Sequence, residues 1–159
     1  MANPCPECGA LLAEGDSCQG IFDAFLAREF TDPGYGEVHM LTVACFMIQH
    51  GRYSDEALAW IEQKLRAVLE EGLSPEELLR QAARETGQRT RTWKVNRGPE
   101  ERSLPRVAWS MTIADVARNE RDARSYCALV RQWAEVTLRE MGRCCPDLEG
   151  PGSEEPDAP

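Results

Sequence analysis

The sequence is poor in the features that mark membrane, secreted and nucleic-acid-binding proteins. It contains no apolar run of about eighteen residues, so we expect no membrane-spanning helix. Its first residues, "MANPCPECGA", lack a basic segment followed by an apolar one, so we expect no secretory signal and a cytoplasmic location. Thiols stay reduced in that compartment, and the odd number of cysteines, seven, also argues against a framework of disulfides.

Basic residues are scarce as well. The 159 residues include 18 Lys and Arg against 27 Asp and Glu, which gives a formal net charge of −9. Only the stretch 88–106 is basic, and its candidate nucleic-acid contacts are Arg89, Arg91, Trp93, Lys94 and Arg97. Because the rest of the chain is acidic, we expect nucleic acid not to be a partner. A protein partner of unspecified identity is the better hypothesis.

What the chain does have is hydrophobic residues at helical spacing. These patterns predict an all-α fold, a single compact bundle of five or six helices over roughly 17–30, 36–50, 54–71, 74–86, 113–119 and 121–141. The helical domain covers residues 1–145, and the acidic, proline-rich residues 146–159 are predicted to form a disordered tail. The stretch "QRTRTWKV" has no clear period and is predicted to form a short strand or an extended arm.

One predicted helix is apolar on nearly every side. This segment, "VHMLTVACFMI", should therefore lie at the buried centre of the bundle. Its Val, Thr, Phe and Ile residues also suit a buried strand, which is the competing prediction. The length of the segment and the natural stop at Gly51 favour a helix. The preceding "TDPGYG" is predicted to break the chain.

Three cysteines fall within the first eighteen residues, in "CPECGALLAEGDSC". Cys5 and Cys8 form a C-x-x-C knuckle, within residues 1–18, that can turn two thiolates toward one ion. Cys18 lies at the predicted start of the first helix, where the positive end of the helix favours the thiolate. Zinc is bound tetrahedrally, and Cys3His is a common structural set. We therefore predict a zinc site in this N-terminal knuckle, with a histidine as the fourth ligand.

His39 and His50 are the only histidines, and both are candidates for that ligand. They lie on one predicted helix, about 16 Å apart along its axis, so one ion cannot bind both. The first two helices are joined by a short break and should pack antiparallel, which brings the start of the first near the end of the second. That geometry favours His50, whereas a splayed connection would bring the knuckle to His39.

Other interpretations of the thiols stay open. A thioredoxin-like redox pair normally opens a helix after a strand, and no strand is predicted before Cys5. Unligated core thiols are the other alternative. Cys45 and Cys127 are predicted to fill apolar helix faces, and Cys144 and Cys145 to be exposed thiols near a frayed helix end.

Acidic residues surround the first two predicted helices. They are Asp23, Glu29, Asp32 and Glu37, and with His39 they could form a metal or acid–base site. A solvated acidic face is the more common arrangement and is our expectation here. His39 itself is either a satisfied polar group in the core or a functional residue.

The segments "CPECGA", "LAREFTDPGYGEVHMLTVACFMIQH", "WSMTIADVA" and "WAE" resemble a bacterial domain family of unknown function. That family combines a CPxCGA knuckle, a third cysteine, an LxREFxDPxYGxVHxLTV segment and a QH pair. The resemblance covers most of residues 5–141 and draws attention to Cys5, Cys8, Cys18, Glu29, Asp32, Tyr35, His39, Gln49 and His50. It implies a metal site but no particular reaction, and it keeps His39 as a candidate ligand beside His50.

Two hypotheses of function follow. The first is a cytosolic zinc-containing interaction or regulatory module, because a Cys3His set leaves no coordination position for water or substrate. The second is a metal-dependent enzyme with an open zinc position, in which Glu29, Asp32 or the free histidine acts as acid or base. The sequence leaves the substrate, the identity of the partner and the oligomeric state open.

Overall fold

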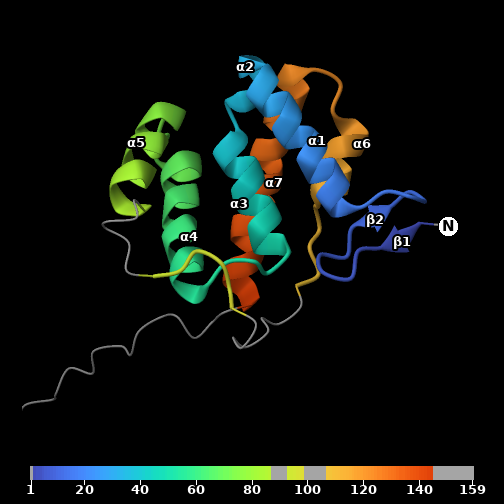
Figure 1. The fold of residues 1–159 in the computed structure, drawn as a ribbon, viewed down its shortest axis with the longest axis horizontal. Coiled ribbons are helices and arrows are strands. Elements are labelled where there is room, and N and C mark those ends of the chain that lie inside the picture. Colours follow the sequence, from blue (N-terminus) through green and yellow to red (C-terminus); the bar gives the residue numbers. More distant parts are fainter. Residues whose placement is uncertain (1, 87–92, 99–106, 145–159) are drawn as a thin grey trace, which may run out of the picture.

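The computed structural model describes residues 2–86, 93–98 and 107–144, and the other residues lie outside its description. Within these ranges the fold is mostly helical, which confirms the all-α prediction (Figure 1). In chain order the elements are β1 (Asn3–Pro4), β2 (Leu11–Leu12), α1 (Cys18–Thr31), α2 (Pro33–Gly36), α3 (His39–Gln49), α4 (Asp55–Glu70), α5 (Pro75–Thr86), α6 (Ile113–Asn119) and α7 (Ala123–Cys144). The described residues form seven helices, whereas the sequence predicted five or six. The difference arises because α2 is a separate one-turn helix.

Local side-chain signals place the helix ends close to where the sequence predicts them. The Ser17 hydroxyl accepts the backbone N–H of Gly20 at the start of α1, and the Ser54 hydroxyl does the same for Ala57 at the start of α4. Each bond satisfies one of the N–H groups that a helix start leaves without an internal partner. The first cap matters for the site, because it fixes Cys18 in the first turn of α1.

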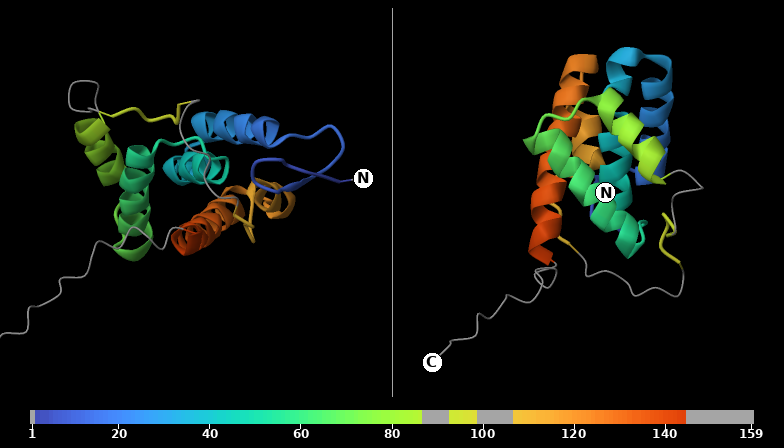
Figure 2. Two further views of the ribbon diagram at one scale, coloured as in Figure 1. Left: turned by 90° about the horizontal axis from the view of Figure 1, so that it is seen from below. Right: turned by 90° about the vertical axis from the view of Figure 1, so that its left-hand side faces the viewer.

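Helix α3 is the centre of the fold. Figures 1 and 2 show it beside α1 and α4 and along α7. Its buried residues include Leu41, Ala44 and Phe46, and α7 contributes the fully buried Tyr126 and Trp133 to the same core. The helix prediction for this segment is confirmed, and the competing strand is wrong because neighbours on several sides bury an all-round apolar helix.

The predicted chain break at "TDPGYG" is in fact the one-turn helix α2. The Asp32 carboxylate accepts the backbone N–H of Gly34 at 2.9 Å and starts this turn. At its end, a Cβ atom on Gly36 would lie 2.7 Å from the backbone oxygen of Glu29, so only glycine fits there. This close approach turns the chain from the end of α1 into the start of α3.

The N-terminal knuckle is built as a small hairpin. Strands β1 and β2 pair antiparallel, with Asn3 opposite Leu12 and Pro4 opposite Leu11. Inside the hairpin, the N–H of Cys5 donates to the Ala10 oxygen at 2.8 Å, and the N–H of Gly9 donates to the Cys5 oxygen at 2.9 Å. Gly9 has φ of +77°, a conformation that glycine adopts without strain. The sequence predicted a loop here and missed the two strands, each of only two residues.

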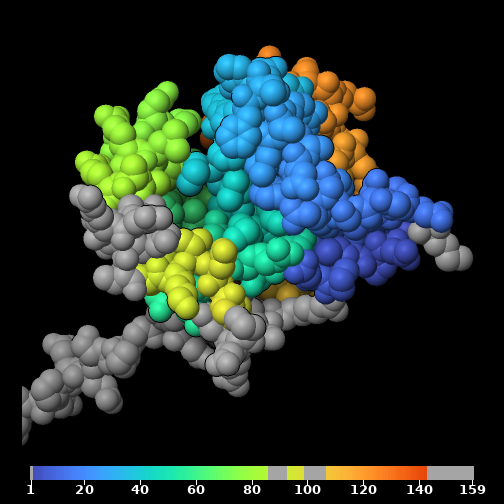
Figure 3. All heavy atoms as spheres, viewed as in Figure 1, coloured from blue at the N-terminus to red at the C-terminus, as the bar shows by residue number. Residues whose placement is uncertain are grey.

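The segment 93–98 lies against the start of α4, and its atoms are the yellow spheres on the face that Figure 3 shows. The Ser54 N–H donates to Val95 and the Ser54 hydroxyl donates to Lys94, both to backbone oxygens. Arg97 forms an ion pair with Asp55 at 2.7 Å, and its side chain is 11% exposed. Arg97, one of the predicted nucleic-acid contacts, is therefore already in an ion pair within the protein.

Several predictions fall on parts of the chain that the structure does not describe. They concern the tail at 146–159, the basic residues Arg89 and Arg91, Cys145 and the side chain of Cys144. No helix in the described ranges combines the length and the apolar character that crossing a membrane requires.

Candidate metal centre

Four of the predicted ligand residues come together at one end of α3. Cys5 and Cys8 lie in the hairpin turn, Cys18 opens α1, and His50 follows the last residue of α3. Their ligand atoms all lie within 4.8 Å of one another, and all four residues are buried. The structure thus brings together the hairpin, the start of α1 and the end of α3. The last two meet because α1 and α3 pack antiparallel.

The spacing of these atoms suits a tetrahedral ion. The Cys8 and Cys18 Sγ atoms are 3.7 Å apart, and the Cys5 Sγ atom is 3.9 Å from His50 Nε2. Zinc–sulfur bonds of about 2.3 Å at the tetrahedral angle separate two sulfur atoms by about 3.8 Å. A disulfide would instead require about 2.05 Å. Three thiolates and an imidazole at these distances therefore fit a zinc ion without large rearrangement.

The orientation of His50 also fits the role of a ligand. Its Nδ1–H donates to the backbone oxygen of Phe46 at 2.7 Å. This bond places the proton on Nδ1 and leaves the lone pair of Nε2 directed at the cysteines. The imidazole also stacks on the Phe46 ring, with 4.1 Å between ring centroids. Metal-bound histidines commonly have such a second hydrogen bond, because it fixes the tautomer and the ring plane.

The electrostatics of the cluster favour a thiolate. The hydrogen bond from the Cys18 thiol lowers the pKa of Cys8 to about 4, with a smaller contribution from His50. The same hydrogen bond raises the pKa of Cys18, and burial raises it further. Burial alone would lower the pKa of His50, but the hydrogen bonds to Cys8 and Phe46 keep it above its ordinary value. These contacts favour a thiolate at Cys8, the form that binds metal.

His39 does not join this cluster. It begins α3 at the opposite end of the helix from His50, and its Nδ1 lies 2.7 Å from a carboxylate oxygen of Glu29. Glu29 is 5% exposed, so the expectation of a solvated acidic face is wrong for this residue. Its carboxylate also accepts the hydroxyl protons of Thr42 at 2.5 Å and Tyr126 at 2.6 Å. These hydrogen bonds offset the cost of burying the charge.

The other acidic residues behave differently from Glu29. Asp23 accepts a hydrogen bond from Gln19 on the exposed side of α1, and Asp32 caps α2. Glu37 forms an exposed ion pair with Arg131 at 3.4 Å. The sequence pattern could not separate Glu29 from these three, because the partner that buries it, Tyr126, lies on the last helix.

The remaining residues singled out in the sequence have structural contacts. Gln49 is buried and donates to the Met111 oxygen and the Thr137 hydroxyl, which ties α3 to α7. Cys45 is fully buried, as predicted, whereas Cys127 is half-buried and its thiol donates to the Gly34 oxygen. A two-residue strand does precede Cys5, contrary to the prediction, but the C-x-x-C pair lies in a hairpin and does not open a helix.

Comparison with known proteins gives a family but no activity. The model of a family described as "Family of unknown function (DUF5946)" matches residues 3–142, which includes all four residues of the cluster. No curated protein and no solved structure matches the chain.

Proposed function

We propose that this chain, which belongs to the family of unknown function DUF5946, is a zinc-containing interaction or regulatory module. Its zinc would be held by Cys5, Cys8, Cys18 and His50 in a reducing compartment such as the cytoplasm. The observation that carries the proposal is the convergence of four buried ligand atoms within 4.8 Å. Three sulfur ligands and one imidazole favour zinc over magnesium or calcium, which prefer oxygen.

The ligand set supports a structural role for the ion. Four protein ligands complete the tetrahedral shell of zinc and leave no position for water or substrate. The bound ion would then join the hairpin to the ends of α1 and α3. Arg118 adds a second link, because its guanidinium donates to the backbone oxygen of Leu11 at 2.7 Å. A rigid hairpin projecting from a helical bundle suits recognition of a protein partner.

A metal-dependent enzyme is the second candidate, and one observation favours it. A cavity of about 350 Å³ borders Cys5, Cys18 and His50, so a small molecule could approach the ion. The acidic residues on this cavity include Glu7, but Glu7 already forms an ion pair with Arg52. Catalysis would require one of the four ligands to leave the ion and open a position for substrate.

Metal analysis tests the proposal directly. Full-length protein purified without added metal should contain about one zinc per chain, and the Cys8→Ser variant should contain much less. Cys127→Ser is the matched control, because Cys127 lies outside the cluster and a serine hydroxyl can keep the bond to Gly34. Zinc below about a tenth of an equivalent in the unaltered protein would refute the proposal.

Cobalt substitution separates the two candidate functions. A closed site should give a tetrahedral Co²⁺ spectrum that does not change when azide or another small anion is added. An open or opening site should show a spectral change that saturates with anion concentration. That second result would replace the structural role with the enzymatic one, while the zinc content would still support the metal site itself.

A further inference from the structure

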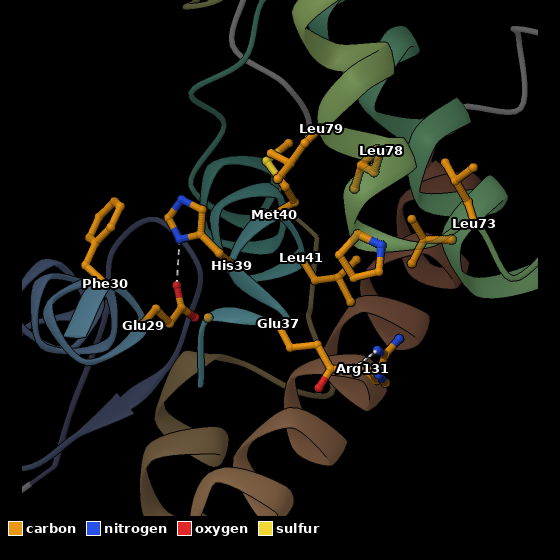
Figure 4. A pocket seen from close by; sticks show the side chains of 13 residues that line it. Glu29, Phe30, Glu37, His39, Met40, Leu41, Leu73, Leu78, Leu79 and Arg131 are labelled. Carbon is orange, nitrogen blue, oxygen red and sulfur yellow. Dashed lines mark hydrogen bonds and ion pairs between the residues drawn. The ribbon is translucent and has the colours of Figure 1, made fainter. Parts of the chain in front are cut away.

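A second site lies at the opposite end of α3 from the cysteine cluster. Here α3, α5 and the end of α1 enclose a pocket of about 220 Å³ (Figure 4). Its apolar walls include Leu41 from α3, Leu78 from α5 and Leu73 from the turn before α5. An apolar cavity of about 150 Å³ holds a benzene molecule, so this pocket has room for a substituted ring.

One wall of the pocket carries a histidine whose tautomer the fold fixes. Glu29 Oε1 accepts the hydroxyl protons of Thr42 and Tyr126, and Glu29 Oε2, as a carboxylate oxygen, accepts a proton from His39 Nδ1 at 2.7 Å. In the neutral imidazole the lone pair is then on Nε2, which points away from Glu29 (Figure 4). The His39 side chain is 31% exposed, whereas that of Glu29 is 1% exposed. A buried anion thus orients a hydrogen-bond acceptor that a ligand can reach.

The charges around the pocket favour an uncharged ligand. Glu29 and Glu37 contribute two negative charges, and Arg131, which pairs with Glu37, contributes one positive charge. Apart from the imidazole, the wall has two carboxylates against one guanidinium, and this excess of negative charge repels an anion. A ligand that carries a hydroxyl group can donate to Nε2 without bringing a charge.

The mouth of the pocket is unusually apolar. Phe30 is 77% exposed and Leu79 is 55% exposed, and both line the pocket. They are two of the three large hydrophobic side chains with high exposure in the described part of the chain. Apolar groups beside a cavity with one polar anchor are typical of sites for small amphipathic molecules.

We propose that this pocket binds a small, uncharged, mostly apolar molecule with a hydroxyl group, such as a substituted phenol. The hydroxyl donates to His39 Nε2, and the hydrocarbon part lies against Leu41, Leu73 and Leu78. The site is independent of the metal centre, so it goes beyond the function proposed above. Glu29 acts as a positioning residue, because it sets the tautomer of His39.

Binding of two matched probes to the zinc-loaded full-length chain tests the proposal. 4-Ethylphenol and ethylbenzene have nearly the same size and differ only in the hydroxyl group. Titration followed by NMR shifts of the pocket residues should show 4-ethylphenol binding about tenfold more tightly, the value of one good hydrogen bond. His39→Leu should remove this preference and leave ethylbenzene binding within about twofold, and His39→Gln should restore part of the preference.

Three results would overturn the proposal. The first is equal affinity of the unaltered protein for both probes. The second is tighter binding of 4-ethylbenzoate than of 4-ethylphenol at neutral pH, which would show an anion site. The third is the absence of shifts at the pocket for both probes up to their solubility limits. The melting temperature of each variant, measured in parallel, excludes unfolding as the cause of lost binding.

Discussion

The two histidines occupy opposite ends of one helix and have different partners. His50 Nε2 faces the cysteine sulfurs, whereas His39 is held by the buried carboxylate of Glu29. We therefore expect His50→Ala to weaken zinc binding by at least about a hundredfold, since loss of an outer partner alone costs about ten- to a hundredfold. His39→Ala is the matched control and should leave the zinc affinity unchanged. Competition with a chromophoric chelator measures both constants.

The opposite result would be informative about the ligand set. Equal zinc affinity of His50→Ala and the unaltered protein would mean that the three cysteines and water suffice, as an open site requires. Lower affinity in His39→Ala would favour the splayed arrangement that the sequence also allowed.

Single residues differ in how far the sequence reveals their roles. The preference for His50 over His39 follows from the sequence, because helical rise and antiparallel packing place His50 near Cys18, although both histidines stayed candidates. The burial of Glu29 does not follow, because it depends on hydroxyl groups of Thr42 and Tyr126 brought together only by the tertiary fold. From the sequence alone, Glu29 is one acidic residue among several, and an acidic side chain is expected to be exposed to solvent.

If the Cys3His cluster holds zinc, the hairpin β1–β2 should depend on the ion more than the helices do. Its two-residue strands bury little surface and cannot form a stable unit alone, whereas α3 and α7 share a large core. Zinc at about a thousand times its dissociation constant would stabilise the folded chain by about 4 kcal/mol. A strong chelator should therefore abolish amide-exchange protection in residues 2–17 and leave the far-UV circular dichroism nearly unchanged.

Loss of all helical signal on chelation would contradict this expectation and show that the metal holds the whole bundle together. The Cys127→Ser variant serves as the control for effects of thiol substitution, since it leaves Cys5, Cys8, Cys18 and His50 unchanged. Re-addition of zinc should restore the protection of the hairpin, which distinguishes metal loss from irreversible damage.

The helices were easier to predict than the connections between them. Capping residues such as Ser17 and Ser54 and the apolar pattern of α3 are local signals, so the helix positions follow from the sequence. The hairpin and α2 were missed because they are very short. Helix α2 needs the contact of Gly36 with the Glu29 backbone, and the hairpin needs the turn at Gly9. Such features depend on close approaches that no periodicity shows.

The fold as a whole joins its first and last segments around α3. The cluster of Cys5, Cys8, Cys18 and His50 is at one end of this helix and the Glu29–His39 pair is at the other, while Gln49 ties the helix to α7. The order of helices along the chain predicts which ends can meet. It does not predict the pocket beside His39, because the walls of that pocket come from side chains on α1, α3, α4, α5 and α7.

In the described residues, Cys45, Tyr53 and Tyr126 are buried groups whose pKa the fold raises. Burial raises the pKa of Cys45 to about 12, and burial likewise raises the pKa values of Tyr53 and Tyr126. In the unfolded chain, cysteine loses its proton near pH 8.5 and tyrosine near pH 10. Above these values the unfolded state binds fewer protons than the folded state, so the free energy of unfolding falls as the pH rises.

The rate of that decline can be tested with one conservative variant. Each group that stays protonated only in the folded state should lower the unfolding free energy by about 1.4 kcal/mol per pH unit above its unfolded pKa. Tyr53→Phe removes one such group without leaving a cavity, so its stability should fall less steeply than that of the unaltered protein between about pH 10 and 11. Urea unfolding at a series of pH values measures both slopes. Identical slopes would show that Tyr53 ionises equally in the folded and unfolded states.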